Sequence, residues 1–181
     1  MYRMSEKPLI GADEIRERIV RLAREIDAVY DYDILLSALT GAYMFTADLS
    51  RELAKIQGPR AQRKKVAFIK ASSYGMSMES SGKLQVYGLD KVDLKGKRVL
   101  MVDDIADSGK TLLGLLDLLR EMGAKDVRTC VLLNKQERRE VDVAANFVGF
   151  EIANEFVVGY GLDYADDYRT LPEIWTLQET N

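Results

Sequence analysis

The chain of 181 residues contains no histidine, one cysteine and three prolines. Histidine is the commonest general acid or base, so any proton transfer must fall to a carboxylate, a lysine or a tyrosine. One cysteine excludes a disulfide within the chain and a structural zinc site. Any metal that the protein binds is therefore expected to be a hard cation with oxygen ligands, such as Mg²⁺.

Long hydrophobic runs are also absent. No apolar stretch approaches the roughly 18 residues that a membrane-spanning helix needs, and the N-terminus lacks the apolar segment of a signal peptide. The single cysteine, Cys130, lies among apolar residues and is expected to be a buried thiol in a reducing compartment. We therefore expect a cytoplasmic protein that has no membrane partner.

The chain carries little excess charge, with a net charge of -3 at pH 7. Its basic clusters, at residues 60–65 and at Arg138 and Arg139, are short and interrupted, and we interpret them as solvated faces. A general electrostatic attraction to nucleic acid is not expected from this balance, so no nucleic-acid partner is predicted.

The composition, with 47% hydrophobic and 30% charged residues, is that of an ordinary folded domain. A chain of this length buries about 70% of its extended surface around one core. We therefore predict a single domain over residues 1–181. Its core is expected at about residues 12–145, and a small hood is expected mainly from about residues 146–181.

Helical and strand-like segments alternate along the core. Apolar residues at helical spacing predict helices at residues 15–29, 42–56 and 111–122. Asp13 is the expected N-cap of the first helix. Short apolar runs predict strands at residues 34–38, 66–69, 84–87, 98–102 and 127–133. The alternation predicts an α/β fold, a mostly parallel twisted sheet flanked by helices, and three further strand-like pieces predict a small C-terminal flap at residues 147–152, 156–160 and 174–177.

The most informative segment is VLMVDDIADSGKT, at residues 99–111. An apolar strand runs into two acids, Asp103 and Asp104, and a third acid, Asp107, precedes a turn of small residues that opens a helix. Ligands of open α/β sheets bind at the carboxyl ends of the strands, and backbone N–H groups at a helix N-terminus suit a phosphate. Because carboxylates alone would repel a phosphate, the segment predicts a sugar phosphate bound together with a metal ion.

Three other interpretations of this segment fit less well. A P-loop would need glycine at the position of Asp104. A response regulator carries its acid pair at the end of the first strand, whereas this pair lies past the middle of the chain. Acids that merely cap a helix are common singly, but here three acids are combined with a run of four turn residues, Ser108, Gly109, Lys110 and Thr111.

The segment resembles the PRPP-binding motif of type I phosphoribosyltransferases, PRPP being 5-phosphoribosyl 1-pyrophosphate. The resemblance implies that Asp103 and Asp104 hold the ribose hydroxyls, and both are also candidate Mg²⁺ ligands. It implies that the following loop binds the 5-phosphate through Asp107, Ser108, Gly109, Lys110 and Thr111. Asp107 is the candidate general base, and no histidine competes with it for that role.

The run FVGFEIANEFVVGYGLDYADDYRTLPEIW, at residues 147–175, closely resembles the purine-binding hood of hypoxanthine-guanine phosphoribosyltransferases. The resemblance implies that Phe156 stacks on the purine, that Val157 offers backbone hydrogen bonds to the base, that Asp163 ligates Mg²⁺ and that Arg169 contacts pyrophosphate. Lys135 falls where the lysine of this family donates to the purine O6. A fixed cation there disfavours adenine, whose amino group is itself a donor.

Two other segments match the family. Thr40 and Gly41 fall where backbone amides reach pyrophosphate, next to a bond before the glycine that can be cis. Relatives commonly carry a lysine or arginine at the position of Thr40, so this chain lacks a cation there. The pair Ser73 and Tyr74 begins the stretch that corresponds to the lid of the family, which closes over the reacting centre.

The resemblance therefore implies transfer of the 5-phosphoribosyl group from PRPP to N9 of hypoxanthine or guanine, with Mg²⁺ as cofactor. It also implies a homodimer or homotetramer. Two alternatives stay open: a PRPP-sensing regulator that binds nucleic acid on the same fold, and a phosphoribosyltransferase that prefers xanthine. The acidic balance of the chain and the presence of Asp107 count against the regulator.

Overall fold

The structure is a computed structural model that describes residues 2–71, 84 and 86–179. Within this part of the chain, six strands form one sheet in the order β4-β3-β2-β5-β6-β7. Their bounds are β2 (Ile34–Leu39), β3 (Lys65–Ala71), β4 (Val86–Tyr87), β5 (Arg98–Ala106), β6 (Asp126–Asn134) and β7 (Phe147–Glu151). All of these strands run parallel except β4, which is antiparallel to β3.

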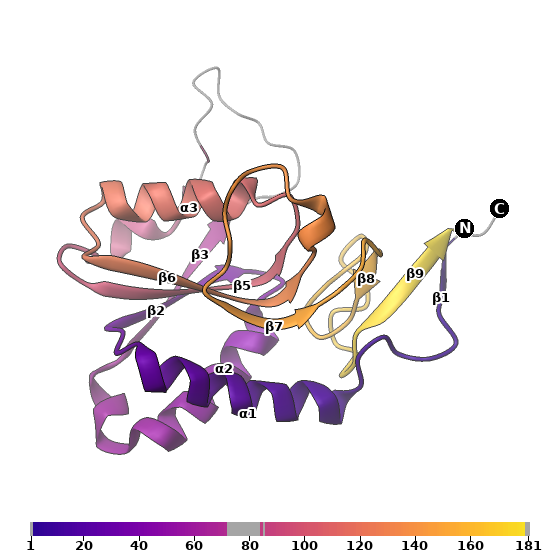
Figure 1. Ribbon diagram of the computed structural model, residues 1–181, viewed down its shortest axis with the longest axis horizontal. Helices are drawn as coiled ribbons and strands as arrows, with labels where there is room; N and C mark the ends of the chain where they lie inside the picture. The colour runs from indigo at the N-terminus through magenta and orange to yellow at the C-terminus, as the bar shows by residue number, and fades with distance from the viewer. Residues whose placement is uncertain (1, 72–83, 85, 180–181) are drawn as a thin grey trace.

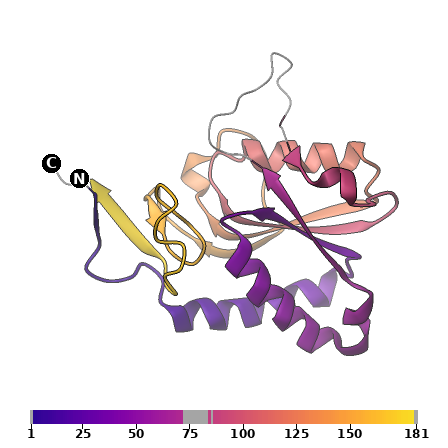
Figure 2. The same ribbon diagram turned by 180° about the vertical axis from the view of Figure 1, so that it is seen from behind.

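Helices cover both faces of this sheet (Figure 1). The helices α1 (Ala12–Val29) and α2 (Tyr43–Gln57) pack on one face, and α3 (Lys110–Glu121) packs on the other, as the view from behind also shows (Figure 2). Alternate residues of β5 point to opposite faces: Leu100 joins the core under α1 and α2, whereas Met101 joins the core under α3. The central strands are continuous apolar runs because both of their faces are buried. Among the described residues, three short 3-10 helices occur in the connections: η1 (Gly58–Arg63), η2 (Leu89–Lys91) and η3 (Gln136–Arg138).

A second, antiparallel sheet lies at one end of the molecule, beside both chain termini (Figure 1). It has the order β1-β9-β8, with β1 (Tyr2–Met4), β8 (Val157–Val158) and β9 (Trp175–Glu179). We call this sheet and residues 159–174 the hood. Ile10 pairs with Ile174 in a β-bridge, and both side chains are buried in the core under α1 and α2. The hood is therefore packed on the same core as the two helices.

The α/β fold with a mostly parallel sheet and a small flap is confirmed, but some boundaries differ from the sequence prediction. Residues 147–151 were expected in the flap, yet β7 pairs parallel with β6 at the edge of the main sheet. Arg18 of α1 holds this edge, because its guanidinium donates to the carbonyls of Val148 and Gly149. The third strand of the hood is instead β1, from the N-terminus.

The start of α1 also differs from the prediction. Its N-cap is Gly11, which makes no side-chain capping bond, and Asp13 lies inside the first turn, where it pairs with Arg16. An acid in the first turn still faces the positive end of the helix dipole, so the residue type suits the position although it is not the cap. Among the described helices, none is long and apolar enough to cross a membrane.

Candidate active site

Three neighbouring strands bring the predicted site residues to one edge of the sheet. Thr40 follows β2, Asp103 and Asp104 lie in the second half of strand β5, and Lys135 follows β6. Because β2, β5 and β6 are parallel neighbours, their carboxyl ends meet at the same edge. The sequence prediction ended the β5 strand at residue 102, but β5 continues to Ala106, which pairs with Asn134 of β6. The acid pair is therefore held within a strand rather than on a loop.

The loop after β2 is packed tightly between β5 and the hood. A Cβ on Gly41 would lie 1.6 Å from Oδ2 of Asp104, so only glycine fits beside this carboxylate. On its other side, a Cβ on Gly161 of the hood would lie 2.1 Å from the carbonyl oxygen of Gly41, and Gly161 has a positive φ of 101°. Two glycines thus let backbone from three separate elements meet around Asp104.

The acid pair is electrostatically strained. Burial and the neighbouring charge of Asp104 raise the pKa of Asp103 well above its usual range, and burial also raises the pKa of Asp104. Each carboxylate accepts one backbone hydrogen bond: the N–H of Asp104 donates to Oδ1 of Asp103 at 3.0 Å, and the N–H of Ile105 donates to Oδ1 of Asp104 at 2.8 Å. Within the described part of the chain, neither carboxylate forms an ion pair. The arrangement favours a ligand that donates hydrogen bonds or carries positive charge.

The loop after β5 leads directly into α3. Gly109 is the N-cap of this helix with a φ of 84°, and no side chain makes the usual capping bond. The N–H of Lys110 reaches Oγ of Ser108 at a long 3.4 Å, and Gly109 has no side chain to offer the N–H groups that follow at the positive end of the helix dipole. A phosphate is the ligand that such a helix start suits best.

Asp107 and Lys135 are brought together, as the candidate base and the candidate purine donor should be. The buried Nζ of Lys135 lies 3.6 Å from Oδ2 of Asp107. The other carboxylate oxygen, Oδ1, has the Nε of Arg138 at 3.0 Å as an ion pair. This buried Oδ1 nevertheless has no aligned hydrogen-bond donor in the described part of the chain. An acceptor of this kind is open to a donor from a ligand.

The hood contributes a further ion pair, which lies next to Gly161. Arg169 forms an ion pair with Asp163 at 2.9 Å, and it donates to the carbonyl oxygen of Gly161 at 2.9 Å. Since Gly161 packs on Gly41, the loop after β2 and the arginine expected at the pyrophosphate are linked through direct contacts. Phe156 is exposed to 45%, and its ring forms a T-shaped pair with the ring of Tyr164 at a centroid distance of 5.8 Å and an interplanar angle of 87°. Because the two rings are nearly perpendicular, Tyr164 does not stack on Phe156, and part of the Phe156 ring stays open to solvent.

Comparison with known proteins agrees with this geometry. The family model for the phosphoribosyl transferase domain matches residues 11–165. The hypoxanthine-guanine phosphoribosyltransferase of Aquifex aeolicus is 39% identical over 176 residues, which are 96% of this chain and 95% of that protein. This chain belongs to the phosphoribosyltransferase family. The hypoxanthine phosphoribosyltransferase of Salmonella typhimurium is 43% identical over 92% of each chain. The solved structure of a Trypanosoma cruzi hypoxanthine phosphoribosyl transferase superimposes with a TM-score of 0.84 at 36% identity, covering 98% of this chain and 94% of the other.

The cis peptide bond joins Leu39 and Thr40, one residue earlier than the expected position before Gly41. The lid residues Ser73 and Tyr74 lie outside the described residues. The carbonyl oxygen of Thr40 accepts from the N–H of Tyr43 at 3.1 Å, so it ties the loop to the first turn of α2.

Functional contacts that sequence reasoning missed come from the segment after Lys135. Arg138 and Arg139 were interpreted as a solvated basic face, but both contact the loop after β5. Glu140 also reaches this loop, through an ion pair with Lys110 that lowers the pKa of Glu140. The signal for these contacts was their position just after β6, because the end of a strand beside β5 must lie next to the end of β5.

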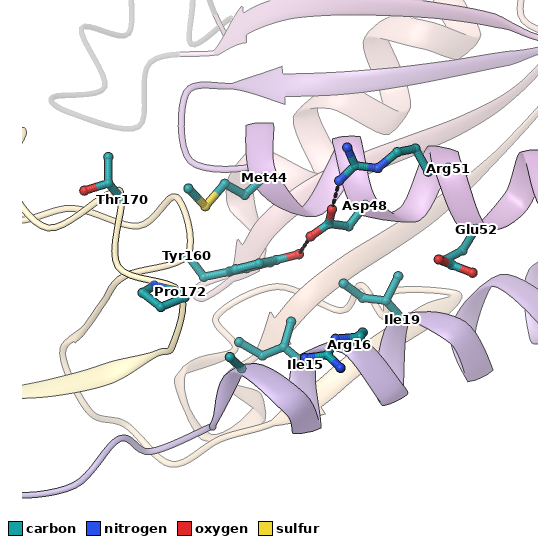
Figure 3. Close-up of a pocket in the computed structure, with 11 residues that line it drawn as sticks. Ile15, Arg16, Ile19, Met44, Asp48, Arg51, Glu52, Tyr160, Thr170 and Pro172 are labelled. Atoms are coloured by element: carbon teal, nitrogen blue, oxygen red, sulfur yellow. Dashed lines mark hydrogen bonds and ion pairs between the residues drawn. The ribbon is translucent and has the colours of Figure 1, made fainter.

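A separate hollow of about 400 Å³ lies between α1, α2 and the hood (Figure 3). Tyr160 extends into it and donates to Asp48 of α2, which is in turn paired with Arg51. Burial, and then the adjacent Asp48, raise the pKa of Tyr160. None of the predicted site residues lines this hollow, so it is distinct from the acid cluster.

Proposed function

We propose that this chain transfers the 5-phosphoribosyl group from PRPP to N9 of hypoxanthine or guanine, giving IMP or GMP and pyrophosphate. The observation that carries the proposal is the position of Asp107. Its Oδ1, which is ion-paired with Arg138 but receives no aligned hydrogen bond from the described residues, and the buried ammonium of Lys135 lie beside a helix start suited to a phosphate. Relatives with hypoxanthine phosphoribosyltransferase names at 39% and 43% identity support the same reaction.

PRPP would be bound along the end of β5. Asp103 and Asp104 would accept hydrogen bonds from the ribose hydroxyls, which suits carboxylates that are half-buried and unpaired. The loop residues Ser108, Gly109, Lys110 and Thr111 would hold the 5-phosphate with their backbone N–H groups at the start of α3. The ligand would thereby be oriented by groups that are fixed before it arrives.

The pyrophosphate group would lie between the loop after β2 and the hood. The guanidinium of Arg169 supplies a planar fork for phosphate oxygens, and backbone groups of Thr40 and Gly41 approach from the other side. The contact of Gly161 with Gly41 supports this placement, because it brings the two segments into van der Waals range. Thr40 contributes no charge there, so among the described residues Arg169 would be the cation of this subsite.

Mg²⁺ fits the donors of the site if the substrate supplies part of its coordination. No group of three or more acidic, histidine or cysteine residues suited to a metal is found among the described residues. Mg²⁺ is commonly held by one or two carboxylates together with substrate phosphates and water, and Asp163, with Asp103 and Asp104 as further candidates, offers such carboxylates. When bound, Mg²⁺ would neutralise the charge of the pyrophosphate leaving group.

The chemical step would form one bond and break another at C1 of the ribose. The lone pair of purine N9 forms the bond to C1, and the bond from C1 to the pyrophosphate oxygen breaks with its electron pair leaving on pyrophosphate. The proton that the purine carries at N7 passes to Asp107. Because C1 gains positive charge as pyrophosphate leaves, the nearby carboxylates would stabilise the transition state electrostatically.

The purine would be recognised by contacts that favour a 6-oxo group. The Lys135 ammonium would donate to O6, and the exposed ring of Phe156 would stack on the base. Val157 is buried in β8 and would present backbone groups to the 2-position edge. Adenine should be a poor substrate, because its amino group would meet the lysine as a donor facing a donor.

The decisive experiment is a panel of adenine, hypoxanthine, guanine and xanthine with PRPP and Mg²⁺, with nucleotide products separated by chromatography. IMP and GMP are the expected products. AMP alone, or no nucleotide from any base, would refute the proposal, and XMP as the main product would favour the xanthine-preferring alternative. A salt-dependent nucleic-acid binding assay on the same preparation tests the regulator alternative.

The variant Asp107→Asn tests the assignment of the base. We expect it to bind PRPP as the wild type does and to lower kcat by the roughly 10² to 10⁴ typical of lost acid or base catalysis. The amide has nearly the same shape but cannot accept the purine proton. A kcat for hypoxanthine near the wild-type value would remove Asp107 from this role.

The expected assembly, a homodimer or homotetramer, is supported by the family resemblance. Light scattering coupled to size-exclusion chromatography would test it directly.

A further inference from the structure

The segment after β6 contacts the phosphate loop with three consecutive residues. Arg138 reaches the side chain of Asp107, with Nε 3.0 Å from Oδ1. The guanidinium of Arg139 donates to the backbone carbonyl of Asp107 at 3.3 Å. The N–H of Glu140 donates to the carbonyl oxygen of Ser108 at 2.9 Å. Side chain and backbone of the candidate base are thus held by two adjacent arginines.

Arg139 is anchored so that it can hold the loop backbone. It also donates to Oδ1 of Asn134, whose amide donates in turn to both carboxylate oxygens of Glu151 on β7. Its Cδ lies 2.8 Å from where a Cβ on Gly109 would be, so its stem fills the space beside this glycine. The loop is therefore tied through Arg139 to two strands of the sheet.

Arg138 contacts Asp107 in a different way. Its Nε is close enough to balance the charge of the carboxylate, yet Oδ1 receives no aligned hydrogen bond. The other cation at this carboxylate, Lys135, lies farther away at 3.6 Å from Oδ2. Arg138 thus supplies positive charge while the acceptor lone pair of Oδ1 stays available.

We propose that Arg138 is a positioning residue for the Asp107 carboxylate and that Arg139 is a positioning residue for the backbone of the phosphate loop. The proposal rests on the proposed function, in which Lys135 turns toward the purine O6. Arg138 then remains as the cation beside Asp107. Without Arg138, Asp107 would depend on Lys135 alone, and the carboxylate would compete with the purine for this ammonium.

The two arginines should therefore affect different substrates. In Arg138→Gln we expect kcat to fall and KM for hypoxanthine to rise, each by about tenfold, since a small misplacement of a catalytic group costs up to about 10². The Kd for PRPP, measured calorimetrically with Mg²⁺, should stay within about twofold of wild type, because Arg138 contacts the side chain of Asp107, whereas the 5-phosphate would be held by backbone N–H groups of residues 108–111. Arg138→Lys should restore part of the loss, since it returns the charge but not the guanidinium geometry.

Arg139→Gln should show the opposite pattern. Arg139 packs on Gly109 at the start of α3 and holds the carbonyl of Asp107, so its loss frees the phosphate loop: the Kd for PRPP should rise by about tenfold, and KM for hypoxanthine should change less. Arg120→Gln is the matched control, because it removes the same charge from α3, where Arg120 pairs with Asp117 and not with the loop. Its kinetic constants should equal those of the wild type.

Two results would overturn the proposal. One is an Arg138→Gln enzyme whose kcat and hypoxanthine KM stay within twofold of wild type, and the other is the same pattern of losses in Arg138→Gln and Arg139→Gln. If the wild-type chain formed no nucleotide product, that result would instead refute the proposed function. The ion pair between Arg138 and Asp107 can be tested even then, by the Tm values of Asp107→Asn, Arg138→Gln and the double variant. If the ion pair exists in solution, the Tm shifts of the two single variants must not add up to that of the double variant.

Discussion

Gly41→Ala is the substitution whose consequence the geometry defines most sharply. The added Cβ would lie 1.6 Å from Oδ2 and 2.6 Å from Cγ of Asp104. Ordinary contacts between non-bonded heavy atoms are about 3.5 Å, so the carboxylate would have to retreat by roughly 2 Å. The effect would come from this contact and not from backbone strain, because Gly41 is not among the glycines with a positive φ.

Asp104 has little freedom to make that movement. Its Oδ1 is held by the N–H of Ile105 at 2.8 Å, and Gly161 closes the opposite side of the loop after β2. Overpacking of this kind costs about 1 to 3 kcal/mol of stability. A displacement of a positioning group by about 1 Å can cost about 10² in rate, so we expect kcat/KM for PRPP to fall by at least that factor.

The measurement combines PRPP titration calorimetry, initial rates of IMP formation and thermal unfolding. Gly114→Ala is the matched control: it lies within α3, and its Cβ would meet the side chain of Leu84 at an ordinary 3.4 Å. This control should stabilise the protein by about 0.5 to 1 kcal/mol and leave the rates unchanged. A Gly41→Ala enzyme with wild-type kcat/KM for PRPP would show that glycine is not required at position 41 to leave room for the Asp104 carboxylate.

Two further predictions concern the purine subsite and the sheet. Lys135→Ala should weaken hypoxanthine binding by about tenfold or more with little change in the Kd for PRPP, and equal losses for both ligands in calorimetry would contradict it. Asp33 accepts hydrogen bonds from the side chain and backbone N–H of Arg98, which lowers its pKa from 3.8 to about 2. The carboxylate therefore stabilises the fold fully above its unfolded pKa and loses this contribution as the pH falls toward 2. The urea midpoint of Asp33→Asn should lie below that of wild type at pH 7, and the gap should narrow at pH 3; a gap of equal size at both pH values would count against this linkage.

The central strands and the acid segment could be predicted because their signals are local. Apolar runs that are buried on both faces and bounded by acids, such as residues 99–104, have a pattern that tertiary contacts do not alter. The sheet to which β7 belongs could not be predicted in the same way. A five-residue apolar strand fits a flap or a sheet edge equally well, and the choice depends on pairing with β6 and on the contact with Arg18.

The missed residues of the site depend on contacts between distant parts of the chain. Arg138 and Arg139 form a short basic pair in the sequence, and only the pairing of β5 with β6 shows that they face Asp107. The need for glycine at position 41 is equally non-local, since it comes from Asp104 in another strand. In both cases the parallel sheet supplies the missing information, because it fixes which strand ends are neighbours.

The placement of both halves of the proposed reaction follows from a single strand. The side chain of Asp104 lies against Gly41 in the loop after β2, and Gly161, which packs on Gly41, accepts a hydrogen bond from the hood arginine, Arg169. Asp107, only three residues beyond Asp104, lies on the side of β6, where Lys135 approaches. A substitution at C1 needs the nucleophile and the leaving group on opposite sides of the ribose, and a sugar held along the end of β5 would have the purine on the β6 side and pyrophosphate on the β2 side. A substitution at Gly41 should therefore affect PRPP, and a substitution at Lys135 should affect the purine, since β5 lies between these two positions.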